Sequence, residues 1–238
     1  VQAYAMVHAT GELEVVETLI MEGEFGFLIA PEVMTVLVNG TLPQFAALGM
    51  TARVDSVAQL YYEEDPGFVI NSEITPEPMF GDTWGVDGIF NMDGELTLLM
   101  NTRSTETMGI DGGLTRVELS DLEVRLMGVM DMEGEAYIEI DGAFLEINVV
   151  EMSTSFFGIG DISADGYFSS SGDFSLEFAG GMKIGDSSFG VWGEASMRVA
   201  YINQSLSFGG SVDAGAKLFG VGLDLPSLGF DYSSSGDI

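Results

Sequence analysis

The feature that most constrains this chain is a short pattern that recurs along it: a glycine, an acidic residue, and then apolar residues at every second position. Its clear copies are MEGEFGF (21–27), MDGELTL (92–98), MEGEAYI (132–138) and SSGDFSL (170–176). Glycine tolerates positive φ and can close a tight turn, and alternation is what a strand with one buried face requires. The copies begin 71, 40 and 38 residues apart. The first spacing is close to twice the others, which suggests a degenerate copy near residues 49–60. We therefore expect a repeat of about 40 residues holding two to four short strands.

Alternation of apolar and polar residues continues between these copies. It is clear in 174–178 and 197–201, and its phase changes at Ser120-Asp121, which predicts a bulge or a turn there. Together these patterns predict an all-β fold: a repetitive antiparallel sheet with Gly-rich turns, arranged as a sandwich, a solenoid-like stack or an extended meander. Residues 51–62 are the exception, since they are compatible with a short helix.

Prolines concentrate near the N-terminus. Five of the six lie in the first 80 residues, at Pro31, Pro43, Pro66, Pro76 and Pro78. Because proline is poor in central strands, the stretch 75–82 is the best candidate boundary. We expect a proline-richer β region over 1–80 and a glycine-punctuated repeat region over 81–238. The alternative is one continuous sheet with a wide loop at this point.

The chain is extremely acidic. It has 38 Asp and Glu against 7 Lys and Arg, a formal net charge of −31. With no basic patch to neutralise phosphates, nucleic acid is excluded as a partner, and an anionic membrane surface is disfavoured. The 16 Phe and 46% apolar residues argue for a folded core rather than disorder. Such acidity permits divalent cations or high salt as a counterbalance.

The remaining global features concern compartment. The chain has no cysteine, which excludes disulfides, thiolate zinc sites and thiol nucleophiles. No apolar run is long enough for a transmembrane helix, and no signal peptide is visible. We interpret the chain as a mature product or a segment of something larger, with an extracellular or cell-surface location.

Catalytic chemistry finds little support. His8 is the only histidine, so a Ser-His-Asp triad would have to use it, and no Gly-x-Ser-x-Gly elbow exists. Close pairs of carboxylates, as glycosidases use, arise by chance among so many acidic residues. Trp84 and Trp192 could flank such a pair, but core packing or an interface explains them equally well. We expect that the chain is not an enzyme, and the sequence identifies no cofactor with certainty, Ca²⁺ being the one candidate.

Calcium is the sharper chemical hypothesis. Oxygen-bearing residues flank turn-like stretches at Asn91, Asp93, Asp131, Glu133, Asp161 and Asp165, which we take as candidate Ca²⁺ ligands. A further acidic cluster, 63–65, precedes Pro66. Calcium requires six to eight oxygens at one point. None of these stretches matches the twelve-residue EF-hand loop or the nonapeptide of calcium-bound β-rolls.

Three function classes remain. The first is a structural subunit or repeat segment of an extracellular fibre, surface layer or matrix, which assembles with copies of itself or with neighbouring repeats through its β edges. The chain has only two lysines, Lys183 and Lys217, with which to protect such edges. The second is a transmembrane β-barrel, and the third is a cation-dependent adhesin that uses exposed Tyr and Trp as sugar platforms.

One resemblance favours the first class. The succession of 94–102, then 116–119, then 126–128 followed by a new Gly-Glu strand resembles the tandem β repeats of very large bacterial surface proteins of the planctomycete type. The resemblance covers roughly residues 85–225, and the N-terminal third departs from it. It implies a cell-surface or extracellular setting and carries no active site over to this chain.

Overall fold

The computed structural model describes residues 5–16, 19–62, 64–79, 81–128, 130–141, 144–155, 160–185, 189–218, 221–224 and 228–233. Every strand belongs to one antiparallel sheet. The elements in chain order are β1 (Ala5–Val16), β2 (Leu19–Ile29), β3 (Val33–Leu42), η1 (Pro43–Leu48), β4 (Met50–Tyr61), β5 (Gly67–Pro78), β6 (Trp84–Val86), β7 (Phe90–Asn101), β8 (Thr115–Leu126), β9 (Met130–Asp141), β10 (Phe144–Ser155), β11 (Gly160–Ser169), β12 (Phe174–Gly185), β13 (Phe189–Ile202), β14 (Ser205–Leu218), β15 (Val221–Asp224) and β16 (Leu228–Ser233).

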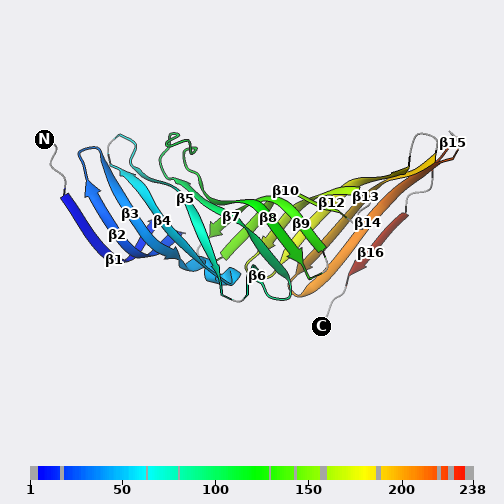
Figure 1. Ribbon diagram of the computed structural model, residues 1–238, viewed down its shortest axis with the longest axis horizontal. Helices are drawn as coiled ribbons and strands as arrows, with labels where there is room; N and C mark the ends of the chain where they lie inside the picture. The colour runs from blue at the N-terminus through cyan, green and yellow to red at the C-terminus, as the bar shows by residue number, and fades with distance from the viewer. Residues whose placement is uncertain are drawn as a thin grey trace.

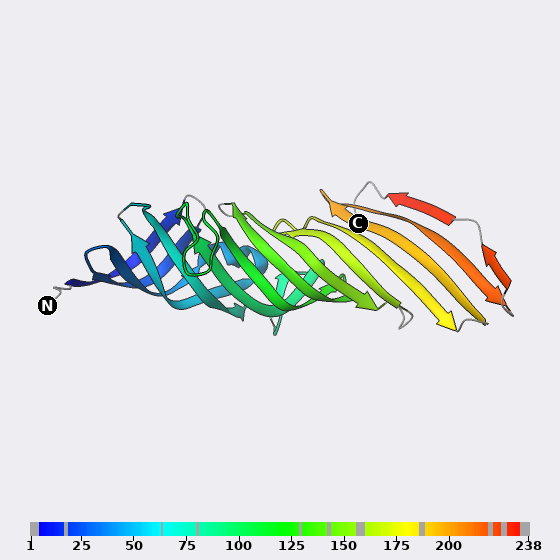
Figure 2. The same cartoon turned by 90° about the horizontal axis from the view of Figure 1, so that it is seen from above.

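The sheet is a meander in which nearly every strand pairs with the next one in the chain (Figures 1 and 2). β6 is a short addition beside the start of β7, and β15 and β16 lie end to end along β14. The all-β antiparallel fold expected from the alternation is therefore confirmed, and the extended meander is the arrangement observed. β5 pairs directly with β7, so the sheet continues across the proline-rich stretch 75–82.

The twist of the sheet creates its core. Adjacent strands are rotated by roughly 20–25°, so opposite corners of a long sheet curl toward one another. Phe90, at the start of β7, meets Phe168, near the end of β11, with ring centroids 4.9 Å apart. β8, β9 and β10 separate these two strands along the sheet. The curled face is called here the inner face, and the opposite one the outer face.

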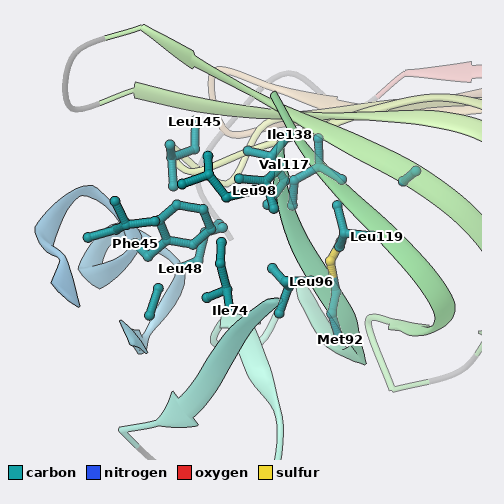
Figure 3. Packing of buried hydrophobic residues seen from close by; sticks show 14 of the residues in the cluster. Phe45, Leu48, Ile74, Met92, Leu96, Leu98, Val117, Leu119, Ile138 and Leu145 are labelled. Carbon is teal, nitrogen blue, oxygen red and sulfur yellow. The ribbon is translucent and has the colours of Figure 1, made fainter. Parts of the chain in front are cut away.

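The 3-10 helix η1 fills the inside of this curl. It connects β3 to β4 and contacts both β6 and β10. Figure 3 shows Phe45 and Leu48 of η1 on the same side of the core as Leu145 and facing the side chains of the central strands. All three are fully buried. η1 thus adds apolar side chains to the core that the inner face of the curled sheet encloses.

The glycine pattern forms strand centres rather than turns in three of its four copies. Gly23, Gly94 and Gly134 lie inside β2, β7 and β9, where the prediction of a turn is wrong. Each is flanked by exposed acids and, two positions away on both sides, by buried residues: Met21 and Phe25, Met92 and Leu96, Met132 and Ala136. The glycine therefore occupies an inner-face position that carries no side chain.

Close approach of two backbones explains one of these glycines. Gly23 lies opposite Gly40 of β3, and a Cβ on Gly23 would come within 2.2 Å of the Asn39 carbonyl oxygen. The fourth copy does form a turn: Gly172 connects β11 to β12 with φ of 89°. A Cβ there would also lie 2.8 Å from Cδ1 of Ile89, so this turn packs against the β6–β7 turn.

Two local predictions have opposite outcomes. The phase change at Ser120-Asp121 is a β-bulge, since the registers with β7 and β9 both shift there and Asp121 has φ of 48°. The short helix with which 51–62 was compatible does not form, because residues 50–61 form strand β4. Val54 and Ala58 are buried there between β3 and β5, so sheet pairing overrides the ambiguous local pattern.

Among the side chains that the structure describes, the packed core does not continue into the C-terminal end of the sheet. Buried hydrophobic side chains run from Leu19 to Phe178, and Ala200 is the only one beyond Phe178 among the described side chains. Met197, Val199 and Tyr201 continue the inner face of β13 and are only partly buried. β13 to β16 therefore form a single layer (Figure 1). No helix of the described residues is long and apolar enough to cross a membrane.

Candidate functional site

Four of the six candidate calcium ligands lie together on the outer face. Asn91 and Asp93 belong to β7, and Asp131 and Glu133 belong to β9. Strand β8 lies between them and adds Glu123 and Arg125. The six residues line one shallow depression of about 420 Å³, together with Thr83, Met92, Val124 and Met132.

Strand geometry fixes their direction. Met92, Val124 and Met132 are each 1% exposed and lie on the inner face, so their neighbours in the three strands point outward. Register then aligns the outward residues in rows across β7, β8 and β9. In one row Asp93 lies opposite Glu123, and Glu123 opposite Glu133; in the next, Asn91 lies opposite Arg125, and Arg125 opposite Asp131.

The two rows differ in electrostatics. Arg125 donates from Nε and Nη2 to the two carboxylate oxygens of Asp131, at 2.6 and 3.1 Å. This hydrogen-bonded pair lowers the pKa of the Asp131 carboxyl and raises that of the Arg125 guanidinium. Both side chains are more than half exposed, so the pair contributes little to stability. The effect of the pair is local: the Arg125 guanidinium already balances the charge of the Asp131 carboxylate.

The carboxylate row has no such compensation in its register. Asp93, Glu123 and Glu133 are exposed and directly opposed, and opposed like charges destabilise a sheet. A second acidic depression, lined by Asp121, Glu123, Glu133 and Glu135, adjoins it. The outer face here attracts cations as a diffuse layer, and salt screens the repulsion.

A closed metal centre is not assembled by the described side chains. They contain no group of three or more His, Cys, Asp or Glu that could hold a metal ion. Asp165 lies on β11 in a different depression, with Glu177 and Arg198. The side chain of Asp161 lies outside what the structure describes. Calcium binding by the set as a whole stays a prediction.

The acidic cluster 63–65 has a structural use. The carboxylate of Asp65 accepts four hydrogen bonds from the β7–β8 loop: the backbone N–H and hydroxyl of Ser104, at 3.1 and 3.0 Å, and those of Thr105, at 3.2 and 2.8 Å. These bonds, led by the Ser104 N–H and the Thr105 hydroxyl, lower the pKa of the Asp65 carboxyl. Glu63 lies outside the described residues.

Arg103 ties the same loop to the β4–β5 connection. Its Nε donates to the Asp65 carbonyl oxygen at 2.8 Å, and its Nη1 donates to the Thr107 hydroxyl at 2.9 Å. The guanidinium lies over the Tyr61 ring, 4.2 Å from its centroid. Arginine therefore serves as a planar cross-link between two loops at one end of the sheet.

Asn101, the last residue of β7, anchors the β7–β8 loop through hydrogen bonds. It is fully buried, and its Nδ2 donates to the carbonyl oxygens of Thr105 and Ile110 at 2.9 and 2.8 Å. Its Oδ1 accepts from the Arg103 N–H at 3.0 Å. Sequence reasoning missed this arrangement, for which the polar run after strand 90–101 and the glycines at 109, 112 and 113 were the available signals.

The edge strands at the two ends of the sheet are further candidate functional surfaces. Among the described residues β1 pairs only with β2, and its residues from Ala5 to Glu12 are all exposed. At the opposite end, β15 and β16 follow β14. Tyr232 of β16 is 51% exposed and stacks on Phe208 of β14, with ring centroids 4.7 Å apart.

The residues considered for catalysis are dispersed. His8 is exposed on the edge strand β1, whereas Trp84 is 2% exposed and belongs to the core. Core packing, one of the alternatives that the sequence left open for Trp84, is what the structure shows, with Trp84 opposite the buried Met92. The side chain of Trp192 lies outside the described set. No family model, curated protein or solved structure matches this chain.

Proposed function

We propose that this chain is a non-catalytic structural subunit, or a repeat segment, of an extracellular or cell-surface fibre, layer or matrix. It assembles with further copies through the edges of its sheet. The observation that carries the proposal is the long exposed edge strand β1, which accompanies a single-layered sheet at the other end.

The composition of β1 supports assembly. Natural sheets protect long edges with lysine, proline or inward-pointing charges. β1 has twelve residues, AMVHATGELEVV, and contains no Lys, Arg or Pro. Its inner-face positions, those that pair with inner-face residues of β2, include Val7 opposite Phe27 and Ala9 opposite Phe25, with no charge among them. Such an edge is a template for another strand.

The single-layered end supports assembly in a second way. β13 to β16 expose large apolar side chains on both faces, including Ile202 at 37% and Tyr232 at 51%. A sheet without a second layer gains little from burial, so its strands are stabilised by extension of the sheet. The acidic outer face keeps such assemblies from collapsing laterally, since like-charged faces repel.

Sedimentation velocity over a range of protein and salt concentrations tests the proposal. Wild type is expected to associate with rising concentration, more strongly at 1 M than at 0.15 M NaCl, because the Debye length falls from about 8 to about 3 Å. Val7→Lys, which places a charge on the inner face of the edge, is expected to weaken association.

Val150→Lys is the matched control. Val150 is 54% exposed, against 50% for Val7, but it lies in β10, which is paired on both sides. Both variants add one positive charge to a highly acidic chain at a similarly exposed valine, one on an edge strand and one on a strand with neighbours on both sides. Wild type that stays monomeric under all conditions, or equal effects of the two variants, would contradict assembly through the edge.

A further inference from the structure

The order and direction of the strands specify how two copies meet. Every pairing along the path from β1 to β16 is antiparallel, and the path contains an even number of strands. The last strand therefore has the opposite direction to the first in the sheet's alternation. A β1 strand from a second copy in the same orientation would continue this alternation as an antiparallel neighbour of β16.

The two edges also match in length. β16 pairs with Ser207–Val212 of β14, and β15 pairs with Gly215–Leu218 farther along the same strand. Together they cover nearly the whole length of β14 from Ser207 onward. β1, with twelve residues, is long enough to lie along both.

The faces match as well. On β16, Tyr232 lies opposite Phe208, which lies opposite the inner-face Val199, so Tyr232 is on the inner face; the neighbouring Asp231 is on the outer face. On β1, Val7 is on the inner face, and Thr10 and Glu12 lie opposite the outer-face acids of β2. Pairing of β1 with β16 keeps the apolar face and the acidic face each continuous across the joint.

We infer that a second copy of this chain adds head to tail, with its β1 pairing antiparallel to β16 and β15 of the first. The inference rests on the proposed function and specifies its geometry. Such a joint is heterologous, because each copy contributes a different edge, and repetition of it builds an open filament unless the rotation closes a ring. Pairing of β1 with β1 would instead give a closed two-fold dimer.

Cysteine pairs distinguish these arrangements, since the chain has no cysteine of its own. Ser233→Cys places one exposed thiol on the outer face of β16, opposite Ser207 of β14. Met6→Cys, His8→Cys and Thr10→Cys sample three outer-face positions of β1, so that the register need not be known. Each β1 variant, carrying a mass tag, is mixed with untagged Ser233→Cys and oxidised mildly under conditions where wild type associates.

Head-to-tail pairing predicts mixed disulfides between the β1 variants and Ser233→Cys, with one position giving the highest yield. The yield should exceed by several-fold that with Asn71→Cys, an exposed position of β5, which is paired on both sides. Disulfides between two β1 variants alone, or mixed yields no higher than with the Asn71→Cys control, would overturn the head-to-tail geometry and leave self-assembly intact. A wild-type protein that does not associate under any condition would instead overturn the proposed function.

Discussion

Phe90 and Phe168 touch across the inside of the curled sheet, although three strands separate β7 from β11 along its path. Both side chains are buried, at 1% and 0% exposure. The ring centroids of Phe168 and Phe174 are 6.0 Å apart. Phe174 in turn stacks on Tyr201 of β13, with ring centroids 6.2 Å apart. The aromatic contacts therefore connect the folded-over corner to the beginning of the single-layered end.

Removal of the Phe168 ring is expected to destabilise the fold strongly. Phe168→Ala should lower the free energy of unfolding by about 3–5 kcal/mol, the usual cost of a large buried cavity. Urea denaturation followed by circular dichroism measures it. Phe144→Ala, at a 43% exposed phenylalanine of β10, is the control and should cost a small fraction of that.

A double-mutant cycle tests the contact itself. Phe90→Leu and Phe168→Leu should show a coupling free energy of about 0.5–1.5 kcal/mol, as ring pairs in contact do. Strict additivity of the two substitutions would mean that the start of β7 and the end of β11 are not in contact.

The glycine at the centre of β2 is expected to tolerate no side chain. Gly23→Ala would place a methyl group 2.2 Å from the Asn39 carbonyl oxygen, which forces β2 and β3 apart. We expect a loss of about 1–3 kcal/mol, typical of overpacking. Gly181→Ala is the control, because its Cβ would meet the Gly193 oxygen at an ordinary 3.8 Å. Equal melting temperatures for the two variants would contradict the close approach of β2 and β3.

The stabilising effect of Asp65 is expected to depend on pH. Its pKa is lowered in the folded state from an ordinary 3.8 by hydrogen bonds from the β7–β8 loop. The charged form therefore stabilises the fold above pH 3.8, and this contribution disappears as the pH falls through the lowered pKa. The stability difference between wild type and Asp65→Asn should be constant near neutral pH and shrink in acid.

Thermal unfolding at a series of pH values measures this difference. Glu64→Gln removes the charge of an exposed neighbour and serves as the control for the general electrostatic effect of acid on so acidic a chain. A difference for Asp65→Asn that is independent of pH down to strong acid would show that its hydrogen bonds to Ser104 and Thr105 are not formed.

Relief of charge repulsion on the outer face is expected to stabilise the protein. Glu123 lies between Asp93 and Glu133 in register, so Glu123→Gln should raise Tm at low ionic strength. The gain should vanish at 1 M NaCl, where the charges are screened. Glu106→Gln, in the β7–β8 loop, removes an equal charge from outside this row.

The same variant separates repulsion from a specific calcium site. A row of carboxylates that attracts cations diffusely responds alike to calcium and magnesium. A calcium-selective rise in wild-type Tm that is abolished by Glu123→Gln would replace the repulsion account with a calcium site at this depression.

Alternation in the sequence was sufficient to predict the sheet and the bulge at Asp121, because both depend on which face each residue occupies. It failed for the glycines of β2, β7 and β9, since a glycine inside a strand can have the same local sequence as one that closes a turn. It failed for β4, whose pairing with β3 and β5 overrides a weak local preference.

The functional surfaces were predicted unevenly for a similar reason. Asn91, Asp93, Asp131 and Glu133 were selected as acidic or amide residues near glycines, and register brings them together. Arg125, which pairs with Asp131, comes from the intervening strand β8, and only the register reveals it. The hydrogen bonds from Ser104 and Thr105 to Asp65 connect residues about 40 positions apart, which no local pattern encodes.

Electron microscopy of the negatively stained protein tests the central claim most directly. The claim is that the open edges of this one sheet are its assembly surfaces. At high salt, we expect particles that elongate end to end with rising concentration for wild type and Val150→Lys, and short particles for Val7→Lys. Single-copy particles for wild type at every salt and protein concentration, or filaments of equal length for all three proteins, would contradict the account.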